Sequence, residues 1–174
     1  MYNATLSPLG VSVGYNNVET NGSGEINISD AKITAADKIN ATAVDKAKSK
    51  SYILDAGIKQ IGYTGVFAYN TNTSQTGIKV GNSSTLDAKA VNFDTKNQTH
   101  RATDTLAISV SGTLGIQTST SEAKDESKNF ITVEGAGNKF TATEINFNAL
   151  KKHVLEVSGG ELLDQKTEMC IRLY

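Results

Sequence analysis

An internal repeat is the feature that most constrains the fold of this 174-residue chain. Three segments share a layout in which apolar residues stand at positions 0, 2, 5 and 7, counted from Ile26, Leu86 or Phe140. Side chains along a strand point alternately to opposite faces, so this pattern predicts two short, half-buried strands joined by a corner. The Gly-, Asn- and Ser-rich turn before each pair tolerates positive φ angles. The three copies are residues 18–33, 78–93 and 131–147.

A weaker echo precedes each copy, and the distance from echo to copy varies. Inserts of unequal length at one place in a repeat usually form loops on one face. The copies are spaced by about 60 and 54 residues, which is long for a single coil of a solenoid. We therefore expect each repeat to span two or three rungs. The echoes are residues 10–13, 65–68 and 115–118.

The composition favours a thin core that is built repeatedly. The chain has one Pro, no Trp and only 6% aromatic residues, so large side chains cannot fill a thick globular interior. A solenoid instead buries a little surface between neighbouring repeats. Ala31, Ala88 and Ala142 are predicted where each rung is narrow. The predicted inward set is Val11, Val13, Ile26, Ile28, Ile33, Ile78, Val80, Leu86, Val91, Phe93, Ile108, Val110, Ile131, Val133, Phe140, Ile145 and Phe147.

Three stretches fit the repeat less clearly. Residues 35–51 have apolar residues at helical spacing and many helix formers, but they also alternate, and we favour a strand. Residues 149–157 suit either a helix or a strand end. Residues 161–174 look foreign to the repeat, as a tail, a cap or a product of truncation. The predicted organisation is a repeat region over 1–160 and a non-repeat tail over 161–174.

Charge and hydropathy exclude several classes of partner. The net charge is −1, with no basic stripe typical of nucleic-acid binding and no basic amphipathic segment. The longest apolar runs are too short to span a bilayer. The single cysteine, Cys170, cannot form an internal disulfide. The N-terminus does not look like a signal peptide, so for an exported protein we expect the signal to lie outside this sequence.

Groups suited to catalysis or metal binding are scattered. His100 and His153 occupy non-equivalent repeat positions, and we expect His100 in an exposed loop. Asp87 and Asp94 bracket one strand pair, but the other copies carry Asn or Thr instead, so no carboxylate column is predicted. We therefore predict a protein that is not an enzyme, with no catalytic residue, metal site or cofactor, and with binding residues unknown. Asn-x-Ser/Thr triplets, a weak hypothesis for glycosylation, begin at Asn3, Asn27, Asn40, Asn72, Asn82 and Asn97.

Residues 71–95 combine a Thr/Ser-rich lead, a Val-Gly-Asn turn and the strands Leu-Asp-Ala-Lys-Ala-Val-Asn-Phe. This style resembles the long repeats of filamentous haemagglutinin-like adhesins, and is most similar to the fusobacterial leukotoxin-like group. The resemblance covers approximately residues 18–160 and rests on repeat style. It implies a right-handed β-helix (β-solenoid) fragment of three repeats of about 54–60 residues. It also implies secretion to the bacterial surface, packing against other repeats of a longer parent chain, and contact with host cells.

Two other functions remain open at the level of sequence. A carbohydrate-active β-helix enzyme, a lyase or hydrolase, predicts clustered Asp and Glu residues in a cleft. A purely structural surface-layer or passenger spacer predicts the same repeat without any binding. Adhesion is the leading hypothesis because the repeats carry variable loops and no recognisable catalytic site.

Overall fold

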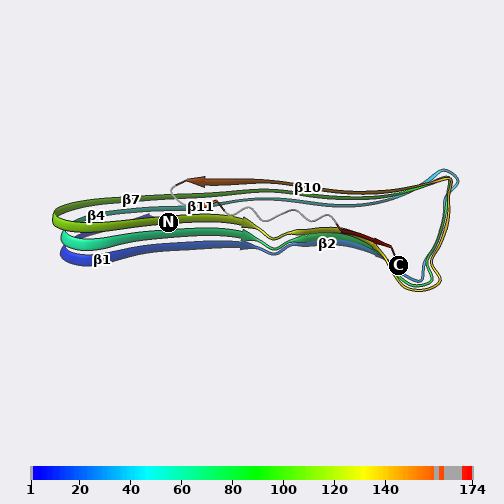
Figure 1. The fold of residues 1–174 in the computed structure, drawn as a ribbon, viewed down its shortest axis with the longest axis horizontal. Helices are drawn as coiled ribbons and strands as arrows, with labels where there is room; N and C mark the ends of the chain where they lie inside the picture. Colours follow the sequence, from blue (N-terminus) through cyan, green and yellow to red (C-terminus); the bar gives the residue numbers. More distant parts are fainter. Residues whose placement is uncertain (1, 159–160, 163–169, 174) are drawn as a thin grey trace.

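A computed structural model shows an all-β chain whose sheets are parallel (Figure 1). It describes residues 2–158, 161–162 and 170–173, with side-chain burial for 9–55, 61–105, 116 and 118–156. Each repeat contains a long strand, a strand of six residues and a strand of three residues. The strands are β1 (Tyr2–Thr20), β2 (Ser23–Ile28), β3 (Lys32–Thr34), β4 (Lys38–Asn72), β5 (Gln75–Val80), β6 (Thr85–Asp87), β7 (Ala90–Asp125), β8 (Lys128–Val133), β9 (Lys139–Thr141), β10 (Glu144–Ser158), β11 (Glu161–Leu162) and β12 (Cys170–Leu173).

Three parallel sheets run through the described residues, and each takes one strand from successive repeats. The long strands pair in the order β1-β4-β7-β10, the six-residue strands together with the four-residue β12 in the order β12-β8-β5-β2, and the three-residue strands in the order β3-β6-β9. Within the predicted tail, β11 pairs with β7 and β12 pairs with β8. One repeat therefore makes a single pass through the three sheets, and the prediction of two or three rungs per repeat is wrong.

Strand register corrects the alignment of the first copy. Ile78 pairs with Ile131 and Leu86 with Phe140, as the sequence comparison predicts. In the first copy, however, Ile26 pairs with Ile78, and it is Ile33 that pairs with Leu86. The apparent 60-residue spacing came from matching Ile26 to Leu86. Paired residues of β1 to β10 are 52 to 54 positions apart, for example Tyr2 with Leu54 and Ala90 with Glu144. The pairs made by β11 and β12 are only 39 and 40 positions apart.

The long strands bend back on themselves at one end of the molecule (Figure 1). We call residues 38–55, 90–105 and 144–156 the forward run, and residues 9–20, 61–72 and 116–125 the return run. Both stretches of ambiguous sequence, 35–51 and 149–157, lie largely within β4 and β10, so the strand interpretation is confirmed and the helical one is wrong. At the other end the chain turns through the short strands. There Gly135 and Gly137 have φ angles of 87° and 83°, as expected for a Gly-rich turn.

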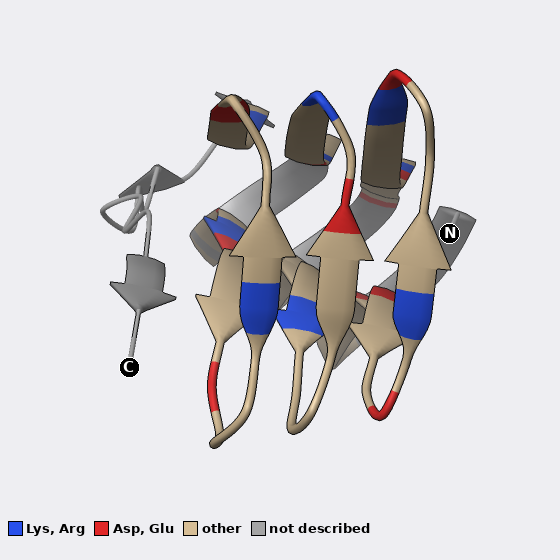
Figure 2. Ribbon diagram, turned by 90° about the vertical axis from the view of Figure 1, so that its right-hand side faces the viewer, with Lys and Arg blue, Asp and Glu red and all other residues tan. Residues whose placement is uncertain are grey.

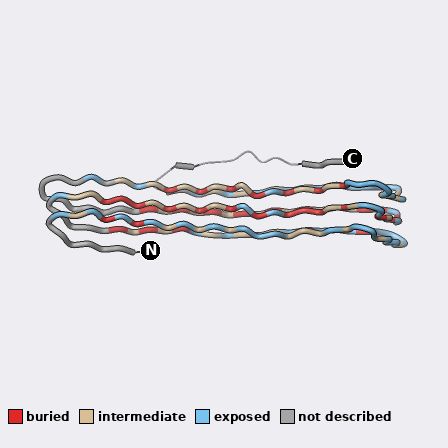
Figure 3. Tube along the Cα trace, turned by 90° about the horizontal axis from the view of Figure 1, so that it is seen from below, coloured by how far each residue is buried: buried red, intermediate tan, exposed pale blue. Residues whose placement is uncertain are grey.

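The main apolar core lies beside these short strands, in the part we call the apolar end. Phe93 stacks on Phe147 with ring centroids 5.2 Å apart and meets Phe140 edge-on at 6.2 Å. The buried members of the core are Ile39, Ala41, Ala43, Ile78, Val80, Leu86, Ala88, Val91, Phe93, Ile131 and Val133. Burial continues along the stacked strands, while the turns at this end are largely exposed (Figure 3). The narrow position beside Ala88 and Ala142 is filled in the first copy by Ala35, whose amide bonds to Asp87, and not by Ala31.

Part of the predicted inward set is wrong. Val11 and Val13 point outward and are 72% and 54% exposed, while Ser12 between them is buried. Because the side-chain period of a strand is two, the register of β1 on β4 decides which set faces inward, and it selects the polar one. Ile33 and Ile145 are exposed because they lie on the outermost repeats, where one neighbouring strand is absent from the described structure. The side chains of Ile108 and Val110 lie outside the described residues.

Candidate functional site

The interior between the forward and return runs is polar over much of its length, in the part we call the polar middle. Asn97 Nδ2 donates to Thr76 Oγ1 at 3.0 Å, and Asn70 Nδ2 donates to the Ala102 carbonyl at 3.1 Å. The first bond joins a side chain of the forward run to β5, and the second joins a side chain of the return run to the backbone of the forward run. The polar middle contains Asn70, Asn72, Ser74, Thr76, Asn97, Thr99, Arg101, Thr103, Ser121, Asp125, Ser127 and Asn129, each buried.

Asp125 is the centre of the polar middle and is only 1% exposed. Its carboxylate accepts hydrogen bonds from Asn72 Nδ2 at 2.7 Å and Thr99 Oγ1 at 3.1 Å, and Lys151 Nζ lies 3.6 Å away. Burial raises the pKa of the Asp125 carboxyl, but hydrogen bonds from Ser127 and Asn72 together with the Lys151 charge outweigh it and lower that pKa. The carboxylate is therefore held ionised inside the fold, where it links successive repeats.

Arg101 brings a second buried charge to the polar middle and is fully buried. Its Nη1 donates to Ser49 Oγ at 2.6 Å and to Thr20 Oγ1 at 3.1 Å. Burial lowers the pKa of the guanidinium, and the charges of Asp125 and Asp45 oppose that shift. These buried groups are enclosed by side chains, which makes them part of the scaffold and not a site open to a substrate.

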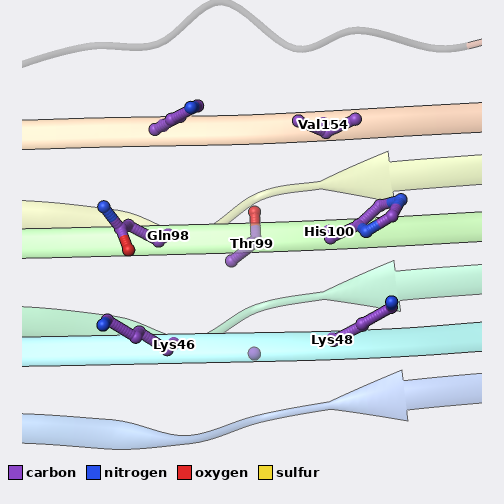
Figure 4. A pocket seen from close by; sticks show the side chains of 8 residues that line it. Lys46, Lys48, Gln98, Thr99, His100 and Val154 are labelled. Carbon is purple, nitrogen blue, oxygen red and sulfur yellow. The ribbon is translucent and has the colours of Figure 1, made fainter.

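A groove lies on the outer face of the forward run, where it crosses β4, β7 and β10 (Figure 4). Its volume is about 330 Å³. Figure 4 shows most of the lining side chains in two columns that cross the strands. Strand register places Lys46, Gln98 and Lys152 in one column, and Lys48, His100 and Val154 in the next. The remaining lining residues are Ala47 and Thr99. We call this the lysine groove.

The lysine groove carries positive charge without an acidic residue in its lining. At its border, Glu156 Oε1 lies 3.2 Å from His100 Nε2. Outward Lys50 and Lys96 continue the positive charge on the same face. The sequence already holds the signal, because Lys46, Lys48 and Lys50 alternate over one strand, but without a confirmed strand and face they read as a solvated charge run.

The opposite outer face, on the return run, is unexpectedly apolar. The columns pair Val11 with Tyr63 and Tyr15 with Phe67, and Tyr15 also contacts Tyr69 with ring centroids 5.6 Å apart. We call this surface the apolar outer face. Its large exposed residues are Leu9, Val11, Val13, Tyr15, Ile61 and Ile116, which are between 44% and 72% exposed. Large exposed apolar patches of this kind mark interaction surfaces on soluble proteins.

The histidines and aspartates that were candidates for catalysis or metal binding lie in different parts of the fold. His100 lies in the middle of β7 and not in a loop, so that prediction is wrong. His153 lies inside, with Nδ1 3.9 Å from Asp125 Oδ2. Asp87 pairs with Thr34 and Thr141, and Asp94 with Thr42 and Asn148. The partner residues in the first copy differ from those expected, but neither aspartate belongs to a carboxylate column.

The Asn-x-Ser/Thr triplets fall in different environments. Asn72 and Asn97 are fully buried and are closed to a modifying enzyme. Asn27, Asn40 and Asn82 are exposed, and Asn40 accepts a hydrogen bond from Asn92, which in turn accepts one from Asn146. The side chains of Asn3 and Cys170 lie outside the described residues.

The described part of the chain has neither a candidate metal site nor a membrane-spanning helix. Its His, Cys, Asp and Glu residues form no group of three that could hold a metal ion. None of its segments is a helix long and apolar enough to cross a membrane. No protein-family model, curated protein or solved structure matches this chain.

Proposed function

We propose that this chain is a segment of a right-handed β-solenoid in a secreted bacterial surface protein of the filamentous adhesin kind. In this proposal it acts by contact with host cells and not by catalysis. The parallel pairing of residues 52 to 54 positions apart supports a solenoid, because each repeat stacks on the next in one register. Such stacking produces long outer faces on which side chains from successive repeats form columns.

The apolar outer face is the observation that supports contact with other molecules. Val11 and Val13 stand exposed in β1 while the polar Ser12 between them is buried, so the apolar side of the strand is the one offered to other molecules. Burying apolar surface contributes roughly 25 cal/mol per Å², which makes such a face adhesive towards a complementary surface. A spacer without a binding role has no need of this arrangement.

A carbohydrate-active β-helix enzyme is the competing proposal. Glycoside hydrolysis normally requires two carboxyl groups within about 10 Å of each other around the scissile bond. The lysine groove is lined by no carboxylate, and the buried carboxylate of Asp125 is enclosed by hydrogen-bond partners. The geometry of the described residues therefore favours contact over catalysis.

The contact proposal can be tested with beads coated with the full chain and applied to cultured mammalian cells. Replacing Val11 and Val13 together by Thr keeps β-branched side chains but makes the apolar outer face polar. Adhesion is expected to weaken about tenfold, since two methyl groups at ~0.8 kcal/mol each correspond to roughly one decade of affinity. The cell-free readout for folding is circular dichroism, which should show unchanged strand content.

Val44→Thr is the matched control, because Val44 is a 47% exposed valine of the forward run on the opposite face. This variant should adhere like the parent chain. Equal loss of adhesion in both variants, or no adhesion of the parent chain, contradicts contact through the apolar outer face.

A further inference from the structure

We propose that the lysine groove binds a linear polysaccharide that carries one carboxylate per disaccharide, such as an alternating uronate and amino-sugar chain. This inference deepens the proposed contact function and rests on it. It assigns the second outer face a ligand of its own, distinct from whatever meets the apolar outer face.

The first argument is charge at a hollowed surface. Lys46, Lys48 and Lys152 surround a cavity of about 330 Å³, and no acidic residue lines it. In a chain with a net charge of −1, this is a local excess of positive charge. An anionic ligand is the complementary occupant.

The second argument is spacing. Lys46 and Lys152 stand at the same position of strands β4 and β10, with β7 between them. Adjacent strands are about 4.8 Å apart, so the two lysine positions are separated by roughly 10 Å across the sheet. That separation matches the length of one disaccharide, which favours a polymer lying across the strands with a carboxylate at each lysine.

The third argument is the residue between the two charges. Gln98 occupies the middle of the same column, and its amide both donates and accepts hydrogen bonds. It is suited to the hydroxyl or acetamido groups of a neutral sugar placed between two uronates. Lysine, amide and lysine thus alternate in the order expected for acid, neutral and acid sugars.

Other polyanions fit less well. No Phe, Tyr or Trp side chain lines the groove, and His100 is its one aromatic ring, whereas proteins that bind single-stranded nucleic acid stack successive bases on several aromatic rings. The lining also contains no arginine, so no planar fork is present to bind a carboxylate or phosphate at two points, and each lysine offers a single-point ionic contact. A singly charged repeat unit is the better match to three separate ammonium groups.

The chain offers a control column with the same spacing. Lys32, Thr85 and Lys139 align across β3, β6 and β9, and Figure 2 shows these strands side by side, with lysine on the outer two and an acidic residue on the middle one. Both control lysines are exposed. They lie outside the lining of the lysine groove and beside Asp87.

The experiment measures binding of a labelled hyaluronan octasaccharide to the full chain by fluorescence anisotropy at low ionic strength. K46Q/K152Q should weaken binding about tenfold, because two exposed ion pairs are lost and each contributes modestly. K32Q/K139Q should leave affinity unchanged. E156Q removes the acid beside His100 and should strengthen binding slightly.

Three results overturn the proposal: no binding by the parent chain, equal loss in K46Q/K152Q and K32Q/K139Q, or tighter binding of a heparin octasaccharide or of oligothymidylate than of hyaluronan. The bead assay separates this failure from failure of the contact function. Adhesion that depends on Val11 and Val13 would persist without a glycan in the lysine groove. Conversely, glycan binding in solution would persist in a chain that does not adhere to cells.

Discussion

The apolar end and the polar middle fill the same interior by different means. At the apolar end, Phe93 and its neighbours exclude water and gain free energy roughly in proportion to the area they bury. In the polar middle, Asp125 and Asn72 are equally buried, but they are satisfied only by each other and by a few facing groups. The comparison shows that a thin fold can be packed by hydrogen bonds where facing strands supply matched partners. Its packing is then less tolerant of the loss of any one partner.

The largest effect is expected at the apolar end. Phe93→Ala removes a ring that stacks on Phe147 and contacts Phe140. The free energy of unfolding should fall by about 3–5 kcal/mol, as is typical for a buried phenylalanine truncated to alanine. Urea denaturation followed by circular dichroism measures this change. Phe93→Leu, which keeps most of the volume, should lose much less; an equal loss would mean that ring stacking and not burial dominates.

The next effect is expected from Asp125→Ala in the polar middle. It leaves the Asn72 amide, Thr99 and the ammonium of Lys151 without their shared acceptor. The expected loss in the free energy of unfolding is about 3 kcal/mol, because removing one member of a buried charged network leaves the other members buried without a partner. The same urea titration applies. If the free energy of unfolding fell by no more than it does for a typical substitution at an exposed position, the polar middle would contribute little to stability.

The pH dependence of stability should separate the two regions further. The pKa of Asp125 is lower in the folded chain than in the unfolded one, where a carboxyl titrates near pH ~3.9. Ionised Asp125 therefore contributes stability above that pH, and the contribution is lost as pH falls through its folded pKa. Thermal melts between neutral and acidic pH should show a steeper loss for the parent chain than for Asp125→Asn. Phe93→Leu should retain the parent slope, and parallel slopes for the parent chain and Asp125→Asn would contradict the role of this carboxyl.

The smallest effect should come from a row of hydrogen-bonded asparagines on the outer surface of the long-strand sheet. Asn92 joins Asn40 and Asn146 through exposed hydrogen bonds of 2.7 and 2.8 Å. Asn92→Ala should cost under ~1 kcal/mol, because water replaces the lost partners at the surface. Comparison with Asn72→Ala, a buried asparagine bonded to Asp125, tests whether burial is the deciding factor. Similar losses for the two variants would show that it is not.

Much of the local structure follows from sequence pattern. The alternation around Leu86 and Phe140 predicts strands and also their mutual alignment, which the pairing of β6 with β9 confirms. The Gly-rich turn at Gly135 and Gly137 is likewise read directly from residue type. The first copy was misaligned, because Ile26 and Ile33 both fit the pattern and only the pairing partner distinguishes them.

Sequence by itself determined that the chain forms strands, where its glycine-rich turns lie, and that its second and third copies are equivalent. Tertiary structure alone decided which face of each strand points inward, because a period of two fixes alternation but not its sign. Val11 and Val13 face outward since Ser12 has a partner inside, Asp55, which is 43 residues away in the sequence. The lysine groove has the same origin. Lys46 and Lys152 come to lie in one column, on either side of Gln98, only through two strand pairings. No local sequence pattern predicts this arrangement.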